Sequence, residues 1–312
     1  MFDVLCRKMK LVEMEEFRCR EYGELPSGFV DVFLAWPKLR ELEANFGQPL
    51  RADDVENLLL RCPLLRVCRL QAFYSNAVKR REPRAAAPAI IHELKHLEYL
   101  HLSGCTVDDA FFSSFNFPRL ETLTLAEAAV HVLRFEEALA RMPACKHIVI
   151  GFNAEVQLTR AAAPPLALQN LHVYSSACHS RDWWFLLRSA SRLIELEICA
   201  RAFVTRAQLS MIPAHGLRNL SRAELQPESN AAVTADAITA FIELCPALRE
   251  LMFTEPAITG AIVDELVKRY KGRKRAVAFE LRDSNCQRAI GLPPLLIFDE
   301  NGVRKPPPQD EA

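Results

Sequence analysis

The sequence has few of the features that mark an enzyme, a membrane protein or a nucleic-acid-binding protein. It contains no P-loop, no G-x-S-x-G and no G-x-G-x-x-G motif, and its 10 glycines in 312 residues leave little material for phosphate-binding loops. No run of about 18 apolar residues is present, so no membrane span is expected. The 39 basic and 39 acidic side chains cancel, which disfavours a protein that coats nucleic-acid phosphates. We therefore expect no cofactor, no nucleic acid and no membrane among its ligands.

The cysteines also exclude several classes of protein. None of the 10 cysteines forms a C-x-x-C pair, so the zinc-ribbon and thioredoxin-like classes are excluded. Cys68 and Cys145 take places where a small apolar side chain is expected, and reduced thiols inside a core are typical of the cytosol or nucleus. The first residues lack the apolar stretch of a signal peptide. The sequence therefore predicts a cytoplasmic or nuclear location, or both.

What the sequence does contain is a repeated pattern of apolar, two residues, apolar, one residue, apolar. Its first members are 23 to 32 residues apart. The eleven triplets are Met9/Val12/Met14, Leu39/Leu42/Ala44, Leu65/Cys68/Leu70, Leu97/Leu100/Leu102, Leu120/Leu123/Leu125, Cys145/Ile148/Ile150, Leu168/Leu171/Val173, Leu193/Leu196/Ile198, Leu220/Ala223/Leu225, Leu248/Leu251/Phe253 and Ala276/Phe279/Leu281. A repeat of this length with this core indicates a leucine-rich-repeat solenoid.

The repeats predict an α/β fold with one continuous array over residues 1–285. We expect about eleven irregular repeats in a curved, right-handed solenoid, with parallel strands on the concave face and helices on the convex face. Prolines such as Pro63 and Pro246 precede the triplets and separate each helix from the next strand, because proline cannot continue a helix. Residues 286–312 lack periodicity and are rich in proline, which predicts a disordered tail. The alternative is an ordinary α/β protein in which strands and helices alternate.

The helices are predicted from acidic or hydroxyl residues that precede apolar spacing. The predicted ranges are 53–61, 110–115, 134–141, 183–187, 235–244 and 260–270.

Residues between the apolar members should point out of the core, because successive side chains of a strand alternate in direction. These outward positions are the candidate partner-binding residues. From the N-terminus they are Glu13, Glu15, Glu41, Glu43, Arg69, Gln71, Tyr99, His101, Thr122, Thr124, His147, His172, Tyr174, Glu195, Glu197, Arg222, Glu224, Glu250, Glu280 and Arg282. The surface is acidic at both ends with histidine and tyrosine near its centre, which favours a basic or mixed protein segment as partner.

Two further interpretations of this surface stay open. The same side chains can be solvated strand residues without a partner, since few residues of an interface contribute much binding energy. If His101, His147 and His172 line one groove, the affinity for a partner should change between about pH 5 and 7.

One motif suggests chemistry. His92-Glu93-Leu94-Lys95-His96 matches H-E-x-x-H, which on a helix places two histidines on one face for zinc and the glutamate as general base. Leu97, Leu100 and Leu102 begin a repeat strand directly after His96, which leaves little room for that helix, and the third ligand of a metzincin is missing. A zinc protease through His92 and His96 is therefore the third hypothesis for function.

The repeats also resemble a known family. Residues 59–66 (Leu-Leu-Arg-Cys-Pro-Leu-Leu-Arg), 242–251 (Ile-Glu-Leu-Cys-Pro-Ala-Leu-Arg-Glu-Leu) and 97–105 (Leu-Glu-Tyr-Leu-His-Leu-Ser-Gly-Cys) resemble the repeats of F-box/leucine-rich-repeat proteins. The resemblance covers about residues 1–285. It implies that the repeats hold a protein substrate while an F-box docks the adaptor of a cullin-RING ubiquitin ligase.

The F-box itself is not found, so docking of an adaptor is expected only if an F-box lies outside this chain or another route is used. The first hypothesis is a non-catalytic recognition module, the substrate-binding repeat region of such a ligase. The second is a general scaffold or regulatory repeat protein without a link to ubiquitin.

Overall fold

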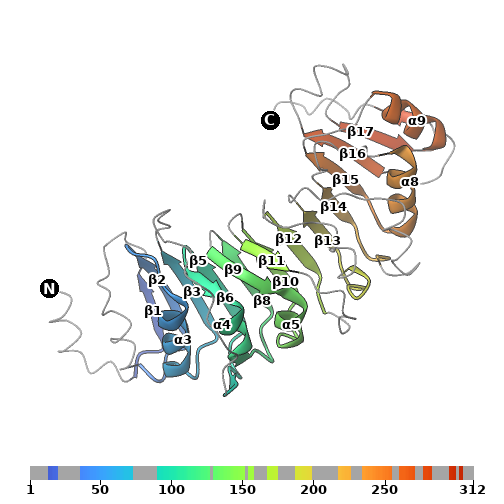
Figure 1. Cartoon of the computed structure of the whole chain (residues 1–312). Coiled ribbons are helices and arrows are strands. Elements are labelled where there is room, and N and C mark those ends of the chain that lie inside the picture. Colours follow the sequence, from blue (N-terminus) through green and yellow to red (C-terminus); the bar gives the residue numbers. More distant parts are fainter. Residues whose placement is uncertain are drawn as a thin grey trace. The chain divides into compact units, whose positions relative to one another are not determined.

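The chain forms two compact units, Met1–Thr159 and Arg160–Ala312 (Figure 1). The computed structural model describes residues 13–19, 36–72, 90–126, 129–151, 154–157, 167–174, 187–198, 217–225, 234–254, 260–270, 277–282, 295–299 and 302–304. Within these residues both units are α/β and dominated by parallel strands, as the sequence predicts.

The first unit is built on six parallel strands that pair in the order of the sequence. They are β1 (Glu16–Cys19), β2 (Glu41–Phe46), β3 (Val67–Ala72), β5 (Tyr99–Ser103), β8 (Thr122–Ala126) and β10 (His147–Ile150). Their register aligns the apolar members of the triplets in rows across the sheet. One row is Phe17, Leu42, Cys68, Leu100, Leu123 and Ile148. From Leu42 onward this row is buried, which confirms the triplets of these strands as the core pattern.

A tight turn leads into these strands. The first member of the triplet donates its N–H to the carbonyl three residues earlier, as in Leu65 to Cys62 (3.1 Å) and Leu120 to Phe117 (3.3 Å). Pro63 and Pro118 take the second position of these turns, where the fixed φ of proline is preferred. The residue at the start of the turn is buried, so the repeat has a fourth core position three residues before the triplet.

A carbonyl just before each strand links that repeat to the next one. Arg40 accepts from the N–H groups of Arg66 (2.7 Å) and Val67 (3.0 Å), and the carbonyls of Glu15, Arg66, Glu98 and Glu121 accept two N–H groups in the same way. The side chains at these positions also pair. The guanidinium of Arg66 donates to both oxygens of Glu98 (3.2 and 2.8 Å), which lowers the pKa of that carboxyl. The repeats of the first unit are therefore joined at equivalent atoms.

The other side of the first unit holds short elements. They are α3 (Ala52–Arg61), α4 (Asp109–Ser113), α5 (Phe135–Ala140), a parallel sheet of β6 (Thr106–Asp108), β9 (Ala129–Arg134) and β11 (Ala154–Gln157), and the pair β4 (His92–Glu93) and β7 (Phe115–Asn116). Asp108 caps α4 by accepting from the N–H of Phe111 (2.8 Å). Phe111, Phe112, Phe115 and Phe117 are buried and their rings contact one another. This side is thus closed by an aromatic core.

The second unit repeats the design. Its parallel strands are β12 (Asn170–Val173), β13 (Glu195–Ile198), β14 (Arg222–Leu225), β15 (Glu250–Thr254) and β16 (Val277–Arg282). The helices α8 (Ala235–Leu244) and α9 (Gly260–Tyr270) lie side by side along them (Figure 1). Thr234 caps α8 by accepting from the N–H of Ala237 (3.2 Å). Of the helix predicted over 183–187, residues 183–186 lie outside the described residues.

The first repeat differs from its prediction. The sequence pattern places a strand at Met9, Val12 and Met14, of which Met9 and Val12 lie outside the described residues. Met14 is not in a strand, and the described strand is β1, in which Phe17 and Cys19 align with Leu42 and Ala44. Met14-x-x-Phe17-x-Cys19 also fits the pattern, and the ring of Phe17 packs against Trp36 with a centroid separation of 4.9 Å. The aromatic contact selects this register, and Glu13 and Glu15 therefore precede the strand.

The prediction of a disordered tail over residues 286–312 is wrong for two segments. β17 (Leu295–Asp299) pairs antiparallel with β16, and β18 (Gly302–Arg304) pairs antiparallel with β17. The run Leu295-Leu296-Ile297-Phe298 is apolar and can extend the sheet by one hairpin. Proline content outweighed this short run in the prediction.

The helices that the structure describes are all too short or too polar to cross a bilayer.

Candidate functional site

The candidate site is the outward face of the parallel strands, meaning the face that carries the side chains between the apolar members. It is described separately for each unit. In the first unit the register gives two outward rows. One is Glu16, Glu41, Val67, Tyr99, Thr122 and His147, and the other is Arg18, Glu43, Arg69, His101, Thr124 and Val149. The residues of these strands that alternation predicts to face outward and that lie in these rows are Glu41, Glu43, Arg69, Tyr99, His101, Thr122, Thr124 and His147.

Carboxylates of the first unit's outward face occur on β1 and β2. Arg18 donates to Glu41 (2.7 Å) and lies 3.6 Å from Glu16. Glu43 lies 4.0 Å from the guanidinium of Arg69 on β3. These acids are therefore balanced by cations of the same chain.

The strands β3, β5, β8 and β10 contain no Asp or Glu at all. Their outward side chains include Arg69, Tyr99, His101, Thr122 and Thr124. The Cζ atom of Arg69 lies 4.7 Å from the centroid of the Tyr99 ring, a cation–π arrangement. The centre of this face is thus neutral to cationic.

The three candidate histidines lie on three different strands. His101 and His147 belong to the first unit, where they are two strands apart and in different rows. His172 belongs to the second unit. Burial lowers the pKa of His101, and the charge of Arg69 lowers it further. The groove of three histidines that the sequence suggests stays a prediction.

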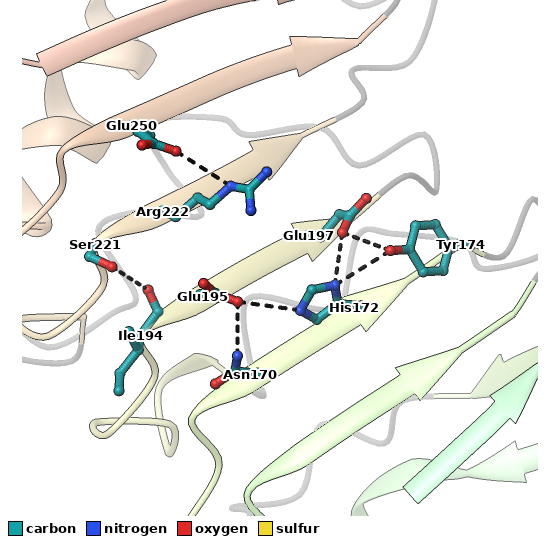
Figure 2. Close-up of polar contacts among 9 residues, drawn as sticks. All are labelled: Asn170, His172, Tyr174, Ile194, Glu195, Glu197, Ser221, Arg222 and Glu250. Carbon is teal, nitrogen blue, oxygen red and sulfur yellow. Dashed lines mark hydrogen bonds and ion pairs between the residues drawn. The ribbon is translucent and has the colours of Figure 1, made fainter. Parts of the chain in front are cut away.

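The second unit places a polar network on β12 and β13 (Figure 2). Nδ1 of His172 lies 2.8 Å from Glu197, and the hydroxyl of Tyr174 donates to the same carboxylate (2.7 Å). Nε2 of His172 lies 3.8 Å from Glu195, which also accepts from the amide of Asn170 (2.8 Å). The imidazole is only 23% exposed. Both acids of β13 are therefore engaged inside the chain.

Further along this face, Arg222 on β14 lies 3.5 Å from Glu250 on β15. Glu224 was predicted to face outward and open, but the residue is only 6% exposed, and Met252, its partner across the strands, is also buried. Alternation predicts where a side chain points, but not whether another part of the molecule covers it.

The residues of this face that were not predicted from the sequence include Glu16, Arg18 and Asn170. The first two were missed because the register of the first strand was wrong. Asn170 directly precedes Leu171, as Glu195 directly precedes Leu196 on the neighbouring strand. Because Glu195 was predicted from this position, the same position predicts Asn170.

The zinc-protease geometry is not formed. His92 and Glu93 make the short strand β4, paired with β7, and Lys95 and His96 lie in the following turn. Glu93 is 3.7 Å from Lys95. Since the motif needs a helix to place both histidines on one face, the hypothesis built on it is wrong. Among the residues with described positions, no group of three or more His, Cys, Asp or Glu could hold a metal ion.

Comparison with known proteins adds little. No family model and no curated protein matches the chain. Among solved structures, it is similar to the "Crystal structure of Rad7 and Elc1 complex in yeast", with a TM-score of 0.36 and 14% identity over 77% of this chain and 70% of that chain. A likeness at this level carries no argument about fold, partner or activity.

Proposed function

We propose that this chain is a leucine-rich-repeat solenoid of about eleven repeats that recognises another protein through the outward face of its strands and is not itself a catalyst. The observation that supports this is the register. In each unit, equivalent residues of successive repeats line up in rows, so that side chains far apart in the sequence form one continuous polar strip. Such a strip on a rigid sheet is suited to holding an extended segment of a partner.

The finer proposal is that the partner is the substrate of a cullin-RING ubiquitin ligase. It rests on the resemblance of residues 59–66, 97–105 and 242–251 to F-box/leucine-rich-repeat proteins. A scaffold or regulatory role without ubiquitin is the second candidate, because the outward face supports recognition in either case.

The test is affinity capture from cell lysate with matched variants. Thr124→Glu and Glu195→Lys change the outward face of the first and second units. Asn57→Glu on α3 and Asp264→Lys on α9 make the same two changes in charge at exposed helical positions. We expect partners to be lost with at least one face variant and kept with both helix variants. Equal recovery with all four variants would refute recognition by this face.

The composition of the captured set separates the two candidates. Cullin and adaptor subunits among the captured proteins support the ligase role. A reproducible partner without those subunits supports the scaffold role.

A further inference from the structure

The parallel strands of the two units differ in how many carboxylates they carry. On β3, β5, β8 and β10 of the first unit there is no carboxylate. On β13, β14 and β15 of the second unit there are four, namely Glu195, Glu197, Glu224 and Glu250. The carboxylate-free face of β3, β5, β8 and β10 is called the central face below.

Two acids that border the central face are neutralised inside the chain. Glu98 and Glu121, just before the strands, are held by Arg66 (2.8 Å) and Lys146 (2.8 Å). A cationic partner would have to displace these internal cations. The charge pattern therefore disfavours the basic segment that the sequence alone suggests.

Arg69 is the one arginine or lysine on the central face. Its side chain is 43% exposed, and its contacts with other described residues are the 4.0 Å approach to Glu43 and the ring of Tyr99. Neither contact is within hydrogen-bond distance, so its N–H donors have no acceptor among the residues whose positions are described. The ring holds the guanidinium in place. The arginine side chain therefore loses less conformational entropy when an anion binds to it.

The surroundings of Arg69 suit an anion. The imidazole of His101 lies beside Arg69 on the next strand, and Thr122 and Thr124 offer hydroxyl donors one strand further along the face, on β8. One arginine is too little charge for a nucleic-acid backbone, which needs a basic patch. A carboxylate fits, because guanidinium and carboxylate form paired hydrogen bonds.

We propose that the central face binds an extended acidic segment of a partner protein, with an Asp or Glu side chain paired to Arg69. This rests on the proposed recognition function and names the chemistry of its partner. Tyr99 acts as a positioning residue that holds the guanidinium over its ring.

The experiment pans a displayed library of random 16-residue peptides on the full chain. Wild type is compared with Arg69→Gln and with Arg61→Gln, the matched control. Arg61 is an exposed arginine in the last turn of α3, outside the outward face. Thermal melts check that all three proteins are folded. We expect wild type and Arg61→Gln to enrich acidic peptides, and Arg69→Gln to bind those peptides at least about tenfold more weakly.

Each outcome supports or overturns the proposal. Enrichment of neutral or basic peptides, or of acidic peptides that Arg69→Gln binds equally well, overturns the acidic partner but leaves recognition by the chain in place. Enrichment of no peptide class on folded wild type overturns the recognition function itself. Tyr99→Leu should lower the affinity for the acidic peptides less than Arg69→Gln does. It removes the ring that supports the guanidinium but leaves the charge.

Discussion

His101 is half-buried on the outward face of β5, and burial together with Arg69 lowers the pKa of its imidazole. Because the folded protein then binds a proton less readily than the unfolded chain, its stability should fall as the pH drops through about 6.5, the ordinary pKa of histidine. The loss continues until the lowered pKa of the folded state is passed.

We expect His101→Gln to flatten the pH dependence of stability over that window. Urea unfolding at several values between about pH 5 and 7.5 measures it. His96→Gln, at an exposed turn position, serves as the control and should keep the wild-type slope. If His101→Gln keeps the wild-type slope of stability against pH, His101 is not the source of that pH dependence.

The buried cysteines give a second test at this scale. Burial raises the pKa of the Cys62 thiol to about 11 and that of Cys105 and Cys145 to about 12. The thiolate is the reactive form, so iodoacetamide near pH 8 should modify these residues at least about a hundredfold more slowly in the native protein than in urea. Peptide-level mass spectrometry gives the rates residue by residue. Rapid native labelling of Cys105 would show that the core is not closed as described.

Individual outward residues could be predicted from the sequence, but their contacts could not. Alternation fixes the direction of Tyr99, His172 and Glu197. The contacts His172–Glu197 and Arg69–Tyr99 depend on the side-chain conformations that these residues adopt, which the repeat pattern does not specify.

Among the elements, the turn after β5 depends on Gly104. It has a φ of 65°, and a Cβ atom there would lie 1.9 Å from the carbonyl oxygen of Ala72. Gly104→Ala should therefore destabilise the protein by more than the roughly 1 kcal/mol that positive φ alone costs an alanine.

Gly104→Asn separates the two causes, because asparagine tolerates positive φ but still carries a Cβ atom. Both variants should lower the midpoint of thermal unfolding by similar amounts. A well-tolerated Gly104→Asn would mean that only the dihedral angle matters at this turn.

Most elements could be predicted because each repeat carries its own signal. The apolar triplets predicted β2 to β16 among the main parallel strands, and the capping residues predicted α8. The small sheet of β6, β9 and β11 was missed, since its strands lie outside the apolar triplets from which the strands were predicted. The hairpin of β17 and β18 was missed because the proline content of residues 286–312 outweighed the short apolar run of residues 295–298 in the prediction.

On the scale of the whole molecule, a repeat contacts mainly its sequence neighbours. A substitution in the core of one repeat should therefore destabilise mainly that repeat and its sequence neighbours. Leu123→Ala in the first unit and Leu196→Ala in the second each remove a buried leucine, at a cost of about 2–5 kcal/mol.

Hydrogen exchange followed by mass spectrometry measures this spread. We expect Leu123→Ala to reduce amide protection mainly within Met1–Thr159 and Leu196→Ala mainly within Arg160–Ala312. Equal loss of protection in both units from either variant would indicate one cooperative block.

The carbonyl that accepts two N–H groups before each strand has a consequence for how such a chain can change. The start of the repeat is fixed to the previous one at the same atoms, whereas the spacing between repeats varies from 23 to 32 residues. Insertions between strands thus lengthen the helical side and leave the rows aligned. A single residue inserted within a strand would instead reverse which of its side chains reach solvent. Evolution is therefore free to vary the length of the segments between strands and the identity of the outward side chains on the strands.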